Sequence, residues 1–147
     1  MRAVTTGGGV GAWITSPSMT ASARQDTATT VKYGGTGWAR ATAGSPYGGT
    51  LKWSGAKGRS ATTVATGRSF AWVSDLGKGR GKAEVWVDGK RVATVSLYAK
   101  AAKARAIVWS TTFASSGKHT IVIKVLGTRA SGATSARVDV DAFLVLT

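Results

Sequence analysis

The sequence predicts an all-β protein: an antiparallel two-sheet β-sandwich or jelly roll of about eight to nine strands, with an N-terminal arm. Three observations predict this fold class. Short β-branched and aromatic runs recur from Thr29 onward, glycines separate them, and only residues 99–106 have a helix-forming composition. The chain has 147 residues, a length typical of one domain that buries its own core.

The first 28 residues differ in composition from the rest of the chain. They are rich in Gly, Ser, Thr and Ala and contain Pro17, as linkers and arms do. Trp13 and Ile14 are the large apolar side chains that would anchor such an arm. We therefore expect an arm or linker over residues 1–28 and a jelly-roll binding domain over residues 29–147.

The remaining residues contain nine runs with the spacing of short strands. We expect strands at 29–33, 50–54, 60–66, 69–74, 82–88, 91–98, 104–110, 118–126 and 136–146. Apolar residues alternate along the last two runs, which indicates one buried face in each. Asp88-Gly89 predicts a tight hairpin turn, because both residue types tolerate positive φ angles. Residues 99–106 are too short for more than one helical turn.

The charge balance indicates a positive surface. The chain has 20 Lys and Arg against 6 Asp and Glu, a net charge of +14, although charged residues make up only 18% of it. Scarcity of acids therefore contributes to the imbalance as much as the excess of basic residues does. A positive field attracts nucleic acid, anionic lipid headgroups or acidic glycans, and it also keeps a protein soluble. No apolar run approaches the ~18 residues of a membrane span, so we expect no membrane insertion.

Few residues are suited to catalysis. The chain has no Cys, which excludes thiol nucleophiles, zinc-finger ligand sets and iron–sulfur clusters. His119 is the single histidine, and no G-x-S-x-G motif supplies a serine nucleophile for it. We therefore expect no enzyme.

One pair of carboxylates is a candidate metal site. Asp139 and Asp141 are two residues apart in a predicted strand, on one face and about 7 Å from each other. That spacing also lies in the broad range of carboxylate catalysis. A structural Ca²⁺ takes 6–8 oxygen ligands, so backbone carbonyls would have to complete its shell. Asp139 and Asp141 are the candidate ligands, and no other cofactor is expected.

The segment Gly77–Lys82 alternates glycine with basic residues. It lacks the G-x-x-x-x-G-K-[ST] pattern and precedes a predicted strand rather than a helix, which argues against a phosphate-binding loop. It predicts an exposed loop from which Lys78, Arg80 and Lys82 project. Two further basic groups would complete an anion-attracting rim if all three meet at one end of the sandwich. These groups are Lys90 with Arg91, and Lys100 with Lys103 and Arg105.

Aromatic residues are the other candidate ligand-binding groups. The chain has 6 Trp, and sugar-binding surfaces stack the apolar face of a pyranose on Trp or Tyr. Trp38, Tyr47 and Trp53 lie in a Gly-, Ser- and Thr-rich stretch where loops are expected, so they are the candidate stacking residues. Nucleic-acid bases would stack on them in the same way, although no RNA-binding motif is present. By contrast, we expect Trp72 and Trp86 in the core, because both lie within regular strands.

Several runs together carry a resemblance to a known family. They are VKYGGTGW, GGTLKWSG, VWVDGK, SLY, GKHTI and VDVDAF. Over residues 29–147 the chain resembles galactose-binding-like β-sandwiches, carbohydrate-binding-module-like domains of the kind appended to secreted actinobacterial proteins. The resemblance implies a non-catalytic module with its ligand on loop aromatics at one end of the sandwich and a structural Ca²⁺ elsewhere.

Three functions therefore remain open. The first is a glycan-binding module that attaches outside the cell to a polysaccharide or cell-surface glycan, including anionic ones. The second is a phage virion structural or adhesion protein (tail, fibre or capsid decoration) whose arm docks on a neighbouring subunit or a second copy. The third is a binder of nucleic acid or another polyanion. The expected location is extracellular or on a virion surface.

Overall fold

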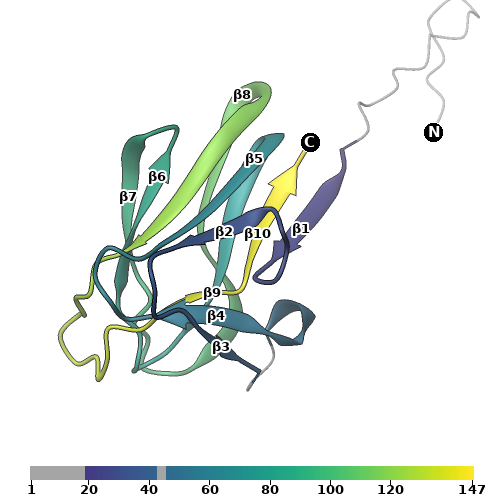
Figure 1. Ribbon diagram of the computed structural model, residues 1–147. Helices are drawn as coiled ribbons and strands as arrows, with labels where there is room; N and C mark the ends of the chain where they lie inside the picture. Colours follow the sequence, from purple (N-terminus) through teal and green to yellow (C-terminus); the bar gives the residue numbers. More distant parts are fainter. Residues whose placement is uncertain (1–18, 43–45) are drawn as a thin grey trace, which may run out of the picture.

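The computed structural model describes residues 19–42 and 46–147, and over these residues it confirms the predicted fold class (Figure 1). They form two antiparallel β-sheets packed as a sandwich. The elements are β1 (Ala21–Gln25), β2 (Val31–Gly34), β3 (Ala39–Ala41), the 3₁₀ turn η1 (Tyr47–Gly49), β4 (Leu51–Ser54), β5 (Ser60–Leu76), β6 (Lys82–Val87), β7 (Lys90–Ser96), β8 (Lys103–Val125), β9 (Val138–Val140) and β10 (Ala142–Leu146).

The larger sheet has the strand order β1-β10-β5-β8-β6-β7, and β2 also pairs with β5. The smaller sheet has the order β3-β4-β9. Strand β1 lies inside the segment expected as an arm, but Ala21 pairs with Leu146, so residues 21–25 belong to the larger sheet. The sequence of β1 shows no apolar alternation because it is an edge strand with mostly exposed side chains. Residues 1–18, including Trp13 and Ile14, lie outside the described residues.

Strands β5 and β8 are longer than predicted. Each combines two predicted strands, and they pair with each other from Ser60–Lys124 to Leu76–Lys103. The register shifts where Arg68 faces residues 113–116, and the Arg68 Nε donates a hydrogen bond to the Phe113 carbonyl oxygen at 3.1 Å. The sequence indicated an interruption at these points. The pairing nevertheless continues past it, so one strand pair connects the part of the sheet beside β2 with the part beside β10.

Another predicted element is corrected. The expected strand 136–146 is divided at Asp141 into β9 and β10, which belong to different sheets. Residues 99–106 contain no helical turn, and β8 begins within them at Lys103. The predicted hairpin turn between β6 and β7 is confirmed, with φ angles of 50° at Asp88 and 82° at Gly89.

The core lies between the sheets. Trp72 and Phe143 are among its largest fully buried side chains, with Ile121 and Ile123 from β8. Trp86 does not join them, contrary to expectation. Strand β6 turns its valines inward and Trp86 outward, where the Lys124 Nζ lies 3.9 Å from the centroid of the indole ring. This outward indole gains a cation–π contact with a lysine instead of core packing.

Candidate binding site

Three loops meet at one end of the sandwich, close to β4 and β9 (Figure 1). Backbone hydrogen bonds join them: the Gly81 amide donates to the Arg137 carbonyl at 2.7 Å, and the Leu97 amide donates to the Gly81 carbonyl at 2.9 Å. Gly81 has no room for a side chain, because a Cβ atom there would lie 2.3 Å from the Ala136 carbonyl oxygen. We call this group of loops the loop end: residues 77–81, 97–102 and 126–137.

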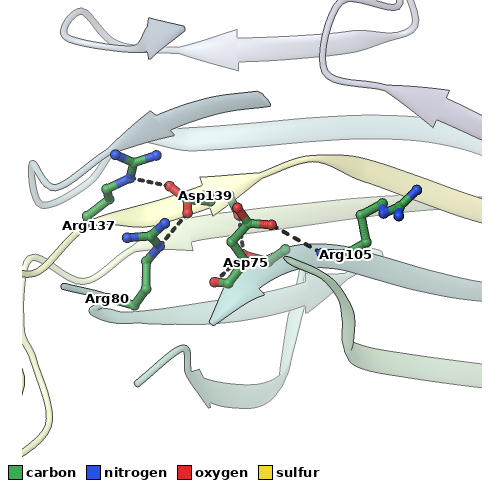
Figure 2. A network of polar contacts seen from close by, with 6 residues as sticks. Asp75, Arg80, Arg105, Arg137 and Asp139 are labelled. Carbon is green, nitrogen blue, oxygen red and sulfur yellow. Dashed lines mark hydrogen bonds and ion pairs between the residues drawn. The ribbon is translucent and has the colours of Figure 1, made fainter. Parts of the chain in front are cut away.

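A buried carboxylate holds two arginines at the loop end. Asp139 of β9 has a fully buried side chain, while Val138 and Val140 on either side of it pack into the core. The Arg137 Nε donates to the Asp139 Oδ1 at 2.5 Å, and the Arg80 Nε forms an ion pair with Oδ2 (Figure 2). Burial raises the pKa of Asp139, while the hydrogen bond from Arg137 and the charge of Arg80 oppose this rise. Asp139 therefore acts as an anchor for two guanidinium groups.

Trp53 extends this cluster onto β4. It pairs with Asp139 in the strand register, and the guanidinium carbon of Arg137 lies 4.6 Å from the centroid of its indole ring. At this distance the guanidinium group and the indole ring attract each other through a cation–π interaction. Arg137 is thus held between a carboxylate and an aromatic ring. We call Arg80, Arg137, Asp139 and Trp53 together the arginine cluster.

Further basic residues surround the arginine cluster. Lys78 is exposed on the same loop as Arg80, and its carbonyl accepts hydrogen bonds from Thr134. Lys82 is half-buried at the start of β6. The structure thus brings Trp53 and Arg80, two residues proposed from sequence, into one cluster, with Lys78 and Lys82 on either side of Arg80 in the chain. Arg137 was missed, because its role depends on a strand register that local sequence does not reveal.

Two of the predicted stacking residues lie in other surroundings. Trp38 packs edge-on against Tyr33 with ring centroids 4.9 Å apart, and its Nε1 donates to the Gly34 carbonyl at 3.2 Å. Tyr47, which is 39% exposed, lies in η1, where its amide donates to the Asp141 carboxylate at 2.8 Å. Among the described residues neither side chain has an aromatic or polar contact with the arginine cluster. Their roles as ligand-binding residues stay predictions.

The candidate metal ligands Asp139 and Asp141 have different partners. Asp139 faces the two arginines, whereas both carboxylate oxygens of Asp141 accept the Tyr47 amide. The second acid beside Asp141 is Asp26: its amide donates to the Asp141 carbonyl at 2.9 Å, and its Oδ1 accepts from the Thr50 hydroxyl at 2.8 Å. Sequence reasoning missed Asp26, because only the pairing of β1 with β10 brings it to Asp141.

Asp26 and Asp141 supply the kind of oxygen ligands that a hard cation prefers. Asp26 Oδ2 is buried without a hydrogen-bond partner, which fits such an ion. Burial, together with the charges of Asp75 and Asp26, raises the pKa of Asp141 to about 6, although the hydrogen bond from the Tyr47 amide opposes this rise. Across residues 19–42 and 46–147 no group of three or more His, Cys, Asp or Glu side chains has metal-binding geometry. A cation here would therefore rely on these two carboxylates together with backbone oxygens.

A separate cavity of about 250 Å³ lies on the larger sheet, where β1, β10, β5 and β8 run side by side. Its lining is mostly small or aliphatic and includes Ala21, Ala71, Leu144 and Leu146. None of the residues proposed from sequence lies in it. It offers a sugar ring neither an indole nor a charged group.

Comparison with known proteins shows the fold. No protein-family model and no curated protein match the sequence. The solved structures with a similar fold include a Paenibacillus xanthan lyase, with a TM-score of 0.60 and 15% identity. The match covers 97% of this chain and 14% of the lyase. They also include a two-domain esterase active on acetylated mannans (TM-score 0.64, 13% identity), with 87% of this chain and 36% of the esterase covered.

A third similar structure is a domain of nearly the same size. It is the CBM36-1 domain of a multidomain xylanase from the hindgut metagenome of Trinervitermes trinervoides, with a TM-score of 0.56 and 12% identity. The match covers 86% of this chain and 96% of that domain. The described residues contain no helix that is long and apolar enough to cross a membrane. The chain thus has a β-sandwich fold like that of a carbohydrate-binding module and of domains in carbohydrate-active enzymes.

Proposed function

We propose that this protein is a non-catalytic module that binds a polysaccharide or cell-surface glycan outside the cell, through its loop end. The observation that carries the proposal is the arginine cluster: Trp53 in cation–π contact with Arg137, beside the basic loop of Lys78 and Arg80. This combines an aromatic ring with cationic donors, the two kinds of group that sugar recognition uses. The similarity in fold to a carbohydrate-binding-module domain over 96% of that domain supports it.

The two side chains considered for catalysis, His119 and Asp139, both make contacts within the fold. The Nδ1 of His119 lies 2.7 Å from the Asp88 Oδ2, and its ring stacks on Phe113 with centroids 3.7 Å apart. These contacts tie the β6–β7 hairpin to β8. Asp139 faces two arginines rather than a second acid. Both groups thus have partners within the fold, and we propose a module without catalytic activity.

The proposal is tested by affinity gel electrophoresis against neutral and acidic soluble polysaccharides at low salt, with calorimetry for any polymer that retards the protein. We expect retardation by at least one polymer and its loss in the Trp53→Ala variant. Trp86→Ala is the matched control, because Trp86 also contacts a cation but lies on β6. Full mobility of the folded wild-type protein in every gel would refute the proposal.

The other two functions named from the sequence gain no support from the structures compared above. None of those structures is a virion component or a nucleic-acid binder. A DNA-containing gel run alongside separates general attraction of polyanions from glycan binding. Retardation by DNA alone would contradict the glycan proposal.

A further inference from the structure

The two arginines of the cluster keep most of their hydrogen-bond donors free. A guanidinium group has five N–H donors. Both Arg80 and Arg137 turn Nε toward Asp139, and their Nη atoms form no hydrogen bond with any residue in the described part of the chain. The side chains are 19% and 24% exposed, so solvent reaches part of each. Each arginine is therefore anchored on one side and has unused donors on the other.

The charges within the cluster do not cancel. Two guanidinium groups meet one carboxylate, and that carboxylate is fully buried. The nearby acid Asp75 accepts the backbone amide of Arg105 at 3.2 Å instead of pairing with either arginine (Figure 2). A pair that served stability alone would need a single cation for the Asp139 charge. The second cation has no carboxylate of its own among the described residues, because Asp139 is the one ion-pair partner that both arginines share, so an anion from solution can pair with it.

The arginines are also held in place before any ligand arrives. Arg80 and Arg137 are joined through a parallel β-bridge between their backbones. Arg137 is additionally fixed by the Trp53 ring. Because the side chains are already ordered, binding costs little further rotamer entropy. Planar guanidinium forks match the paired oxygens of carboxylate and sulfate groups, which a lysine cannot contact in the same bidentate way.

From these contacts we propose that Arg80 and Arg137 form a two-guanidinium site that binds an oxyanion, a carboxylate or a sulfate ester, carried by an acidic glycan. This inference rests on the proposed glycan-binding function and specifies its ligand. The carboxylate of Asp139 orients both forks, Trp53 supports Arg137, and the exposed Lys78 adds to the local positive field.

The experiment compares matched polymers by calorimetry: polygalacturonate with its carboxyl-reduced form, and dextran sulfate with dextran. The first pair tests carboxylate as the ligand group and the second pair tests sulfate. We expect the acidic member of at least one pair to bind tenfold or more tightly than its neutral counterpart. Arg80→Lys and Arg137→Lys keep the charge and remove the fork, so we expect each to weaken acidic binding about tenfold. Arg40→Lys, at an exposed position on β3, is the control.

The outcomes distinguish this inference from the proposed function. Equal binding of acidic and neutral polymers overturns the two-guanidinium site and leaves glycan binding intact. Equal losses in the control and in the two site variants also overturn it, because the general field would then explain the binding. Absence of binding to every polymer overturns both proposals.

A measurement on the wild-type protein does not depend on the variants folding. NMR signals of the arginine side-chain nitrogens are followed during titration with galacturonate oligomers and with a sulfated oligosaccharide. We expect the signals of Arg80 and Arg137 to shift with at least one ligand while that of Arg40 stays in place. Unchanged signals of Arg80 and Arg137 with both ligands overturn the inference.

Discussion

The substitution Asp139→Asn tests the anchoring role of the buried carboxylate. It keeps the shape of the side chain and removes its charge, so Arg80 and Arg137 lose their counter-ion while the backbone of β9 can stay in place. Removing one partner of a buried ion pair typically costs ~3–5 kcal/mol. Asp139 is fully buried, but both arginines are partly exposed and can turn toward water. Asn also removes the cost of burying the Asp139 charge, which raises the pKa of this carboxyl despite the two arginines. We therefore expect a loss at the lower limit of that range, about 3 kcal/mol of unfolding free energy.

In a domain of this size a loss of 1 kcal/mol lowers Tm by about 2–4 °C, so we expect a drop of about 6–12 °C for Asp139→Asn. Calorimetry and urea titration give the two quantities independently. Asp88→Asn is the matched control, because Asp88 also pairs with a basic side chain but is 48% exposed, and exposed pairs contribute below about 1 kcal/mol. A loss below 1 kcal/mol for Asp139→Asn would refute the reasoning.

Three further predictions concern other parts of the fold. The folded-state pKa of Asp141, about 6, exceeds its ordinary value of 3.8, so the stability that this group contributes is present at acidic pH and is lost as pH rises through about 6. In urea titrations at pH 5 and pH 7, the unfolding free energy of Asp141→Asn should therefore change less with pH than that of the wild-type protein. An identical change in both proteins would contradict this. Millimolar Ca²⁺ should raise Tm, because a cation bound at Asp26 and Asp141 favours the folded state, and EDTA or Asp26→Asn should abolish the gain. An unchanged Tm of the wild-type protein would exclude a Ca²⁺ site at these two carboxylates. Gly81→Ala places a Cβ atom against the Ala136 carbonyl and should lower the unfolding free energy by about 1–3 kcal/mol in urea titration. Gly79→Ala has room for its Cβ atom and should lower it less. Equal losses would show that the loops do not pack as described.

Local sequence patterns predicted the parts of the fold that depend on local chemistry. Alternation in the second half of β8 identified its inward-facing isoleucines, and Asp88-Gly89 identified the hairpin turn. In β6 the wrong face was expected in the core, because the large apolar Trp86 was assigned there instead of the valines. Strand β1 was not predicted, because an exposed edge strand needs no apolar face. The full length of β5 and of β8 was not predicted either, because Gly67 and Gly117 suggest turns at positions where the two strands remain paired.

The candidate site was predicted only in part, for a related reason. Trp53 and Arg80 were singled out by residue type and loop context, and Asp139 by its spacing from Asp141 in a predicted strand, each in a different role. Their contact depends on the register of β4 with β9 and on Arg137, which lies between the indole ring and the carboxylate. A register between strands far apart in the sequence cannot be deduced from spacing alone. Asp139 consequently proved to be the partner of two arginines.

The most direct test of the central claim is to map the ligand onto the protein. In a titration of ¹⁵N-labelled protein with galacturonate oligomers, the account predicts chemical-shift changes concentrated in residues 77–82 and 126–139 and at the Trp53 indole N–H. The cavity face formed by β1 and β10 should remain unchanged and serves as an internal control. Shifts confined to that face, or the absence of shifts at the loop end, would contradict the account.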